Sequence, residues 1–187
     1  MMKKMETSDR LRGIKRHGAV QRSLTKTGKS KVASLDDTIN SLLSGKEGEE
    51  KKNRLVFSEV PFNGSRVDIV VLVPGKTIIF VEFKTTKLDK PPKAAYDRQI
   101  TKSFRDFMKY VSSPARVNKY RSSRTEGIKF YYLLTVEKCG GKDETTIARD
   151  GLVIPDMKYG HMFADSSDRH KAWIRKKLSF KTKKKKA

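Results

Sequence analysis

Two carboxylates and a lysine stand in stretches of sequence that are otherwise almost entirely apolar. Asp68 lies within RVDIVVLV, and Glu82 and Lys84 lie within TIIFVEFKTT. An ionised side chain in a buried strand is costly unless a partner compensates its charge, and a cation is the obvious partner for two acids. Hard oxygen ligands of this kind suit Mg²⁺ or Mn²⁺, which retain several waters and can bridge to a phosphate. These residues are therefore candidates for metal-assisted chemistry.

The two apolar stretches are predicted to be neighbouring strands of a hairpin. Pro74-Gly75-Lys76 separates them and favours a tight turn, so Asp68 and Glu82 lie at comparable distances from it. Lys84 is two residues beyond Glu82 and projects from the same face of the strand. The hairpin thus brings both acids and the lysine to one point. The structural alternative is a half-buried salt bridge of Lys84 with Glu82 or Asp68.

The surrounding pattern predicts a mixed α/β domain. Ser34 and Asp37 form a capping-box arrangement before apolar residues at helical spacing, which predicts a helix near residues 34–44. Three consecutive strands are predicted at residues 55–62, 66–73 and 77–86, and since tight turns join them they must form an antiparallel meander. The remaining predicted elements are a helix that begins at Gln99, a strand at residues 128–137 and an edge strand at residues 151–155.

Positive charge is concentrated at the two ends of the chain. The 187 residues carry a net charge of +22; residues 1–34 hold ten Lys and Arg against two acids, and residues 169–187 hold ten against none. We therefore expect a basic flexible arm (1–33), a central domain (34–168), and a basic helix with a lysine-rich tail (169–187). Such a charge favours a nucleic acid as partner, because neutralised phosphates release counterions.

Membrane and secreted classes of protein are disfavoured. The sequence has no run of 18 apolar residues and no apolar signal region near its N-terminus, and the single cysteine, Cys139, cannot form an internal disulfide. We expect an intracellular protein without membrane association, nuclear if the host has a nucleus and cytoplasmic otherwise.

The residues around the candidate site resemble a known nuclease signature. GSRVDIVV followed by IIFVEFKTTK resembles the motif of the PD-(D/E)xK nuclease superfamily, in particular the archaeal Holliday-junction resolvase and VRR-NUC branches, over roughly residues 55–110. Val67 replaces the proline that the family usually has before the aspartate. The resemblance implies a restriction-endonuclease-like mixed central sheet flanked by helices, here with basic disordered tails.

The resemblance also implies roles for individual residues. Asp68 and Glu82 would bind Mg²⁺ or Mn²⁺ with help from the main-chain carbonyl of Phe83, Lys84 would position or activate the attacking water, and Gln99 would lie at the site. The family also contributes an acid from its first helix. Here the sequence does not decide among several acids, namely Asp36, Asp37, Glu47, Glu49, Glu50 and Glu59.

These observations lead to one expected function and one alternative. We expect a Mg²⁺-dependent endonuclease that hydrolyses phosphodiester bonds, in DNA rather than RNA, with a structure-specific substrate such as a junction or flap. A serine-rich loop with Arg116, Lys119, Arg121 and Arg124 is the predicted nucleic-acid clamp. By analogy with resolvases, a homodimer is expected. The alternative is a non-catalytic DNA- or RNA-binding protein on a nuclease-like fold.

Overall fold

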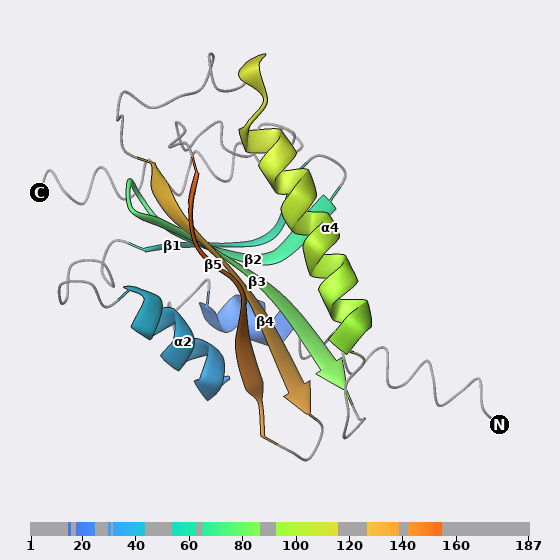
Figure 1. The fold of residues 1–187 in the computed structure, drawn as a ribbon. Coiled ribbons are helices and arrows are strands. Elements are labelled where there is room, and N and C mark those ends of the chain that lie inside the picture. Colours follow the sequence, from blue (N-terminus) through green and yellow to red (C-terminus); the bar gives the residue numbers. More distant parts are fainter. Residues whose placement is uncertain are drawn as a thin grey trace, which may run out of the picture.

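A five-stranded mixed sheet forms the centre of the protein in the computed structural model, with helices on both faces (Figure 1). The structure describes residues 15, 18–24, 30, 32–43, 54–62, 65–86, 93–115, 127–138 and 142–154. The elements in chain order are α2 (Ala33–Leu43), β1 (Leu55–Phe62), β2 (Ser65–Val73), β3 (Thr77–Thr86), α4 (Lys93–Val111), β4 (Ile128–Lys138) and β5 (Glu144–Ile154). None of the helices described is long and apolar enough to cross a membrane.

The sheet has the strand order β1-β2-β3-β4-β5. β1, β2 and β3 pair antiparallel, so the predicted meander is confirmed. β4 pairs parallel with β3 after the crossover through α4, and β5 pairs antiparallel with β4. A mixed sheet with helices on its faces confirms the coarse α/β prediction.

Each face of the sheet has its own hydrophobic core. On one face, α4 packs through buried residues at helical spacing, Ile100, Ser103, Phe107, Tyr110 and Val111, against alternate residues of β2, β3 and β4. On the other face, α2 and the helical residues 18–24 cover the intervening residues of the same strands. Because β2 and β3 are covered on both sides, their nearly continuous apolar sequence is explained.

β1 and β2 bend locally beside the candidate site. Glu59 has φ 53°, a left-handed conformation that non-glycine residues rarely adopt, and it lies between the register pairs Ser58↔Ile69 and Val60↔Val67. Val67 and Val70 both belong to the core under α4, although residues three apart on a regular strand face opposite sides. Both strands therefore turn at Glu59 and Asp68.

Several details of the helices differ from the predictions. α2 begins at Ala33, so the predicted Ser34–Asp37 capping box is wrong; the Ser34 Oγ lies 3.0 Å from Thr145 Oγ1 on β5. α4 begins at Lys93 rather than at Gln99, because KAAYDR already contains good helix formers.

The predicted flexible arm and the predicted edge strand also differ from the structure. Residues 18–24 are helical, and Val20 and Leu24 are buried under the sheet, so this part of the arm packs on the domain. β5 begins at Glu144, well before the predicted start at Gly151. Its first residues could not be recognised from the sequence, because an edge strand with mostly exposed side chains lacks the apolar run that marks a buried strand.

Candidate active site

Glu82 is the centre of a small polar cluster within the core under α4. This charged residue is only 1% exposed, and its neighbours along β3 are apolar. Its Oε1 accepts hydrogen bonds from Lys84 Nζ at 2.6 Å and from Gln99 Nε2 at 2.5 Å. The two-residue spacing of Glu82 and Lys84 does place both side chains on one face of β3. The structure thus joins three of the predicted site residues through a single carboxylate oxygen.

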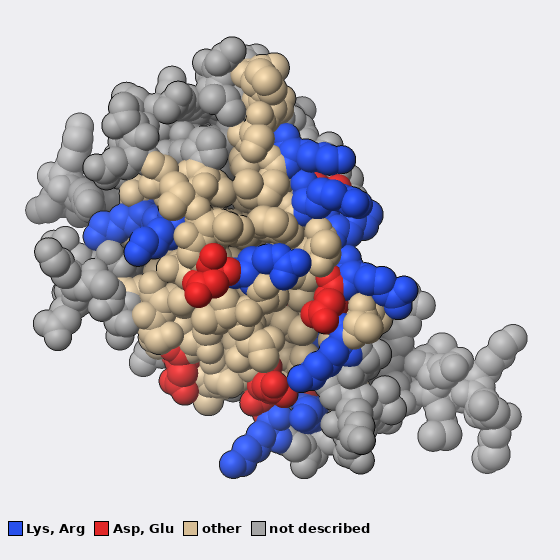
Figure 2. All heavy atoms as spheres, viewed as in Figure 1, with Lys and Arg blue, Asp and Glu red and all other residues tan. Residues whose placement is uncertain are grey.

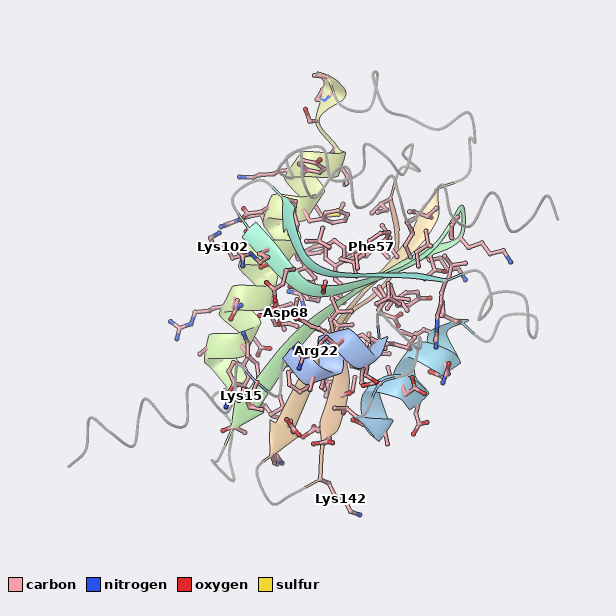
Figure 3. The ribbon with its side chains drawn as sticks, turned by 180° about the vertical axis from the view of Figure 1, so that it is seen from behind. Lys15, Arg22, Phe57, Asp68, Lys102 and Lys142 are labelled. Atoms are coloured by element: carbon pink, nitrogen blue, oxygen red, sulfur yellow. The ribbon has the colours of Figure 1, made fainter. Side chains whose placement is uncertain are left out.

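Asp68 reaches the same region from the neighbouring strand. It lies one residue beyond the β2–β3 pair Ile69↔Val81, as Glu82 does on the other strand. The main-chain N–H of Phe83 donates to Asp68 Oδ2 at 2.8 Å, so the backbone of β3 orients this carboxylate. Figure 3 shows Asp68 beside α4 and above the blue helical segment that carries Arg22. The hairpin therefore positions both acids, as its spacing predicts.

Gln99 comes to the site from α4 rather than from a strand. It lies in the second turn of the helix, not at the helix end where the sequence placed it. Its amide nevertheless donates to Glu82, because the helix crosses the sheet with its apolar face down and carries Gln99 at one edge of that face.

Tyr132 is a site neighbour that sequence reasoning missed. It lies on β4, pairs in register with Phe80, and is 0% exposed. Burial raises the pKa of the Tyr132 hydroxyl, and the negative charges of Glu82 and Asp68 raise it further, while the nearby Ser103 hydroxyl lowers it. The hydroxyl therefore stays protonated and is available as a hydrogen-bond donor. In IKFYYLLTVE nothing separates this tyrosine from ordinary core residues.

Replacing Tyr132 by phenylalanine gives a stability prediction with a definite dependence on pH. A folded-state pKa above the unfolded value of about 10 stabilises the protein below pH 10, and this contribution is lost as pH rises above it. The difference in unfolding free energy between wild type and Tyr132→Phe is therefore expected to shrink between pH 8 and pH 11. Urea unfolding of both proteins at pH 8 and at pH 11 measures this difference. A difference that is the same at both pH values would contradict a raised pKa of the Tyr132 hydroxyl.

Glu59 is the acid, among those left open by the sequence, that lies beside Asp68. Gln21 Nε2, from residues 18–24, donates to Glu59 Oε1 at 2.5 Å and to the Asp68 carbonyl oxygen at 3.1 Å. Arg66 forms an ion pair with Glu59 at 3.2 Å. The N-terminal helical segment is thereby tied to the site, a contact with no signal in the sequence.

The other candidate acids do not share this place. Asp36 and Asp37 lie on α2, which covers the opposite face of the sheet, and Asp36 Oδ1 accepts the main-chain N–H of Ser30 at 3.0 Å. Three further acids lie outside the described residues, namely Glu47, Glu49 and Glu50. The basic residues of the predicted clamp also lie outside them, namely Arg116, Lys119, Arg121 and Arg124.

A divalent cation needs oxygen donors, and the site can supply two carboxylates. Within the part of the chain that the structure describes, no three His, Cys, Asp or Glu side chains gather as a ligand group. Mg²⁺ is commonly held by one or two carboxylates, with waters and substrate phosphates in its other positions. Asp68 and Glu82, each one residue beyond the Ile69↔Val81 pair on neighbouring strands, fit that requirement.

Comparisons with known proteins provide no assignment: no protein-family model, no curated protein and no solved structure matches this chain.

Proposed function

We propose that this protein is a metal-dependent nuclease of the PD-(D/E)xK type, with the restriction-endonuclease-like fold that this implies. One observation carries the proposal. Glu82 and Lys84, which residue type and spacing indicate, and Gln99, which the family resemblance indicates, meet at one buried carboxylate oxygen, and Asp68 is oriented beside them by the backbone of β3.

The energetic cost of this cluster supports a functional reason for it. Burial of a carboxylate and an ammonium group costs several kcal/mol per ion, and the attraction between them repays this only in part. Glu82 is 2% exposed and Lys84 23% exposed in their side chains. Apolar residues of similar volume would fill this part of the core without that cost, so the pair is a poor choice for stability alone.

Each residue of the cluster has a distinct task in the proposed reaction. Asp68 and Glu82, with the main-chain carbonyl of Phe83, would hold Mg²⁺ or Mn²⁺. When bound, such an ion polarises the scissile phosphate and lowers the pKa of water. The ammonium group of Lys84 orients the attacking water and offsets the negative charge that develops on the phosphate. Gln99 fixes the orientation of the Glu82 carboxylate through its hydrogen bond.

DNA is the proposed substrate, and a junction or flap is the proposed preference. The net charge of +22 supports a polyanion as partner, and the choice of DNA and of a homodimer rests on the resemblance to resolvases. The non-catalytic alternative has one observation in its favour, because the 2.6 Å contact between Lys84 and Glu82 is also what a purely structural ion pair would show.

A cleavage assay with an aspartate variant separates the two functions. Wild type, Asp68→Asn and Asp106→Asn are incubated with labelled duplex, single-stranded, flap and four-way-junction DNA, with Mg²⁺, with Mn²⁺ or with EDTA. We expect cutting by wild type only with a metal ion, and a fall of about 10²-fold or more in rate for Asp68→Asn.

Asp106 provides a matched control on the same side of the sheet. Hydrogen bonds from Lys102 and then Ser65 hold the pKa of this carboxyl below its usual range, so it is a structural acid outside the cluster. Asp106→Asn is expected to cut at a rate near that of wild type. If the wild type binds DNA but cuts no substrate with either ion, the non-catalytic function holds instead.

A further inference from the structure

Four exposed cations lie along one side of α4. Arg98, Lys102, Arg105 and Lys109 are separated by four, three and four residues, and all are exposed. At 3.6 residues per turn they fall within about 60° of one another around the helix axis, and they span about 16 Å along it. Figure 2 shows Lys and Arg running down the edge of the molecule that α4 forms in Figure 1. We name these residues the α4 basic stripe.

The stripe and the candidate active site share one rigid element. Gln99 follows Arg98 directly and donates to Glu82, about a quarter turn away from the stripe. Lys102 Nζ lies 3.4 Å from Ser65 Oγ at the start of β2, three residues before Asp68. A polyanion held along the stripe is therefore held at a constant position relative to the carboxylates.

The chemistry of the stripe favours a double-stranded nucleic acid. Single-stranded nucleic acids are usually held by exposed aromatic rings on which bases stack. The aromatic residues of α4 instead belong to or pack against the core, namely Tyr96, Phe104, Phe107 and Tyr110. The exposed surface of α4 thus offers a row of cations on a stiff helix, within which Lys102 forms an ion pair with Asp106 at 2.8 Å. Such a row matches the phosphates along one edge of a stiff duplex.

We propose that the α4 basic stripe binds the phosphates of one strand of a nucleic-acid duplex and so directs the adjoining segment toward Asp68 and Glu82. This inference rests on the proposed function for its second half. Because each strand winds around the duplex axis while it rises 3.4 Å per phosphate, the straight stripe reaches only a few successive phosphates of one strand. Arg98 and Arg105 supply planar donors that bind phosphate oxygens in pairs.

Binding of full-length protein to a labelled 30-base-pair duplex, in EDTA and over a series of salt concentrations, tests the stripe. The test variant is Arg98→Gln/Arg105→Gln/Lys109→Gln. The control, Lys76→Gln/Lys129→Gln/Lys142→Gln, removes the same charge at exposed positions on the β2–β3 turn, on β4 and before β5. Figure 3 shows Lys142 well away from Lys102.

The expected result is a difference between two proteins of equal net charge. Each lost phosphate contact lowers the slope of log K against log salt by about 0.9, so the stripe variant should lose about 2.7 and bind at least about tenfold more weakly near 0.1 M salt. The control should change by less than about threefold. The variant Arg98→Lys/Arg105→Lys, which keeps the charge, should retain most of the wild-type binding.

Equal weakening in the stripe variant and the control would overturn the proposal, since charge alone would then explain binding. No weakening in either would overturn it as well. Because these measurements contain no metal ion and no cutting, they do not depend on nuclease activity. The proposed function fails separately, if wild type binds the duplex through the stripe but no substrate is cut.

Discussion

Replacing Glu82 by glutamine is expected to lower the cleavage rate strongly while leaving the protein folded. The amide keeps the shape of the side chain but loses the charge that both the proposed metal ion and Lys84 require. We expect a fall in cleavage rate on the order of 10²–10³-fold or more. The side chain of Lys84 is 23% exposed and can turn to water, so the loss of unfolding free energy should stay near about 1 kcal/mol. Single-turnover cleavage and urea unfolding measure the two effects.

Lys84→Met is expected to lower both the stability of the protein and its cleavage rate. It leaves the Glu82 carboxylate, which is 2% exposed in its side chain, without its cation, a loss on the order of 3 kcal/mol. Cleavage should fall as well, since no ammonium group remains beside the reacting phosphate. The double variant Glu82→Gln/Lys84→Met should be more stable than Lys84→Met alone, because it no longer buries an unpaired charge. Additive losses in the double variant would argue against a coupled pair.

Glu137→Gln is the matched control for both variants. Glu137 is a buried carboxylate, 4% exposed, on the strand next to β3, and it lies opposite Thr85 in the register. Its position, one residue beyond Val136 of the core under α4, turns it toward the other face of the sheet. Wild-type cleavage by Glu137→Gln, with loss of cleavage in Glu82→Gln, would locate the chemistry at one carboxylate. Equal loss in both would indicate a general effect of removing buried charge.

Local sequence was sufficient to predict the centre of the candidate site. Pro74-Gly75-Lys76 determines the hairpin, and alternation along a strand determines that Glu82 and Lys84 share a face. These relations involve residues close in sequence or joined by one turn, and the backbone alone imposes them.

The outer part of the site depends on packing between distant segments and was not predictable in this way. Gln21 is 47 residues from Asp68 in sequence and contacts its carbonyl oxygen only because residues 18–24 pack under the sheet. Tyr132 becomes a neighbour of Glu82 through the parallel pairing of β3 and β4 after a long crossover. The left-handed conformation of Glu59 has no signature in a residue type that normally avoids it.

Replacing Phe80 by alanine is expected to cause the largest loss of stability. Phe80 is fully buried on β3, and its ring centroid lies 4.5 Å from that of Phe107 on α4 and 5.0 Å from that of Phe130 on β4. Phe62 and Tyr132 complete the ring cluster at 5.7 and 5.8 Å. Truncation leaves a cavity that these large rings cannot fill by small movements, so we expect a loss of about 3–5 kcal/mol in unfolding free energy.

Urea unfolding of Phe80→Ala beside Val153→Ala provides the measurement and its control. Val153 is 69% exposed on β5, and its truncation should change the unfolding free energy by no more than about 0.5 kcal/mol. Small domains commonly have 5–15 kcal/mol of stability, so Phe80→Ala should lose a large part of it. Phe80 precedes Glu82 by two residues on the same face, and the milder Phe80→Leu should therefore lower cleavage at temperatures where the protein is still folded. Full cleavage by Phe80→Leu would mean that the hydrogen bonds of Glu82, rather than the rings beneath it, hold the carboxylate in place.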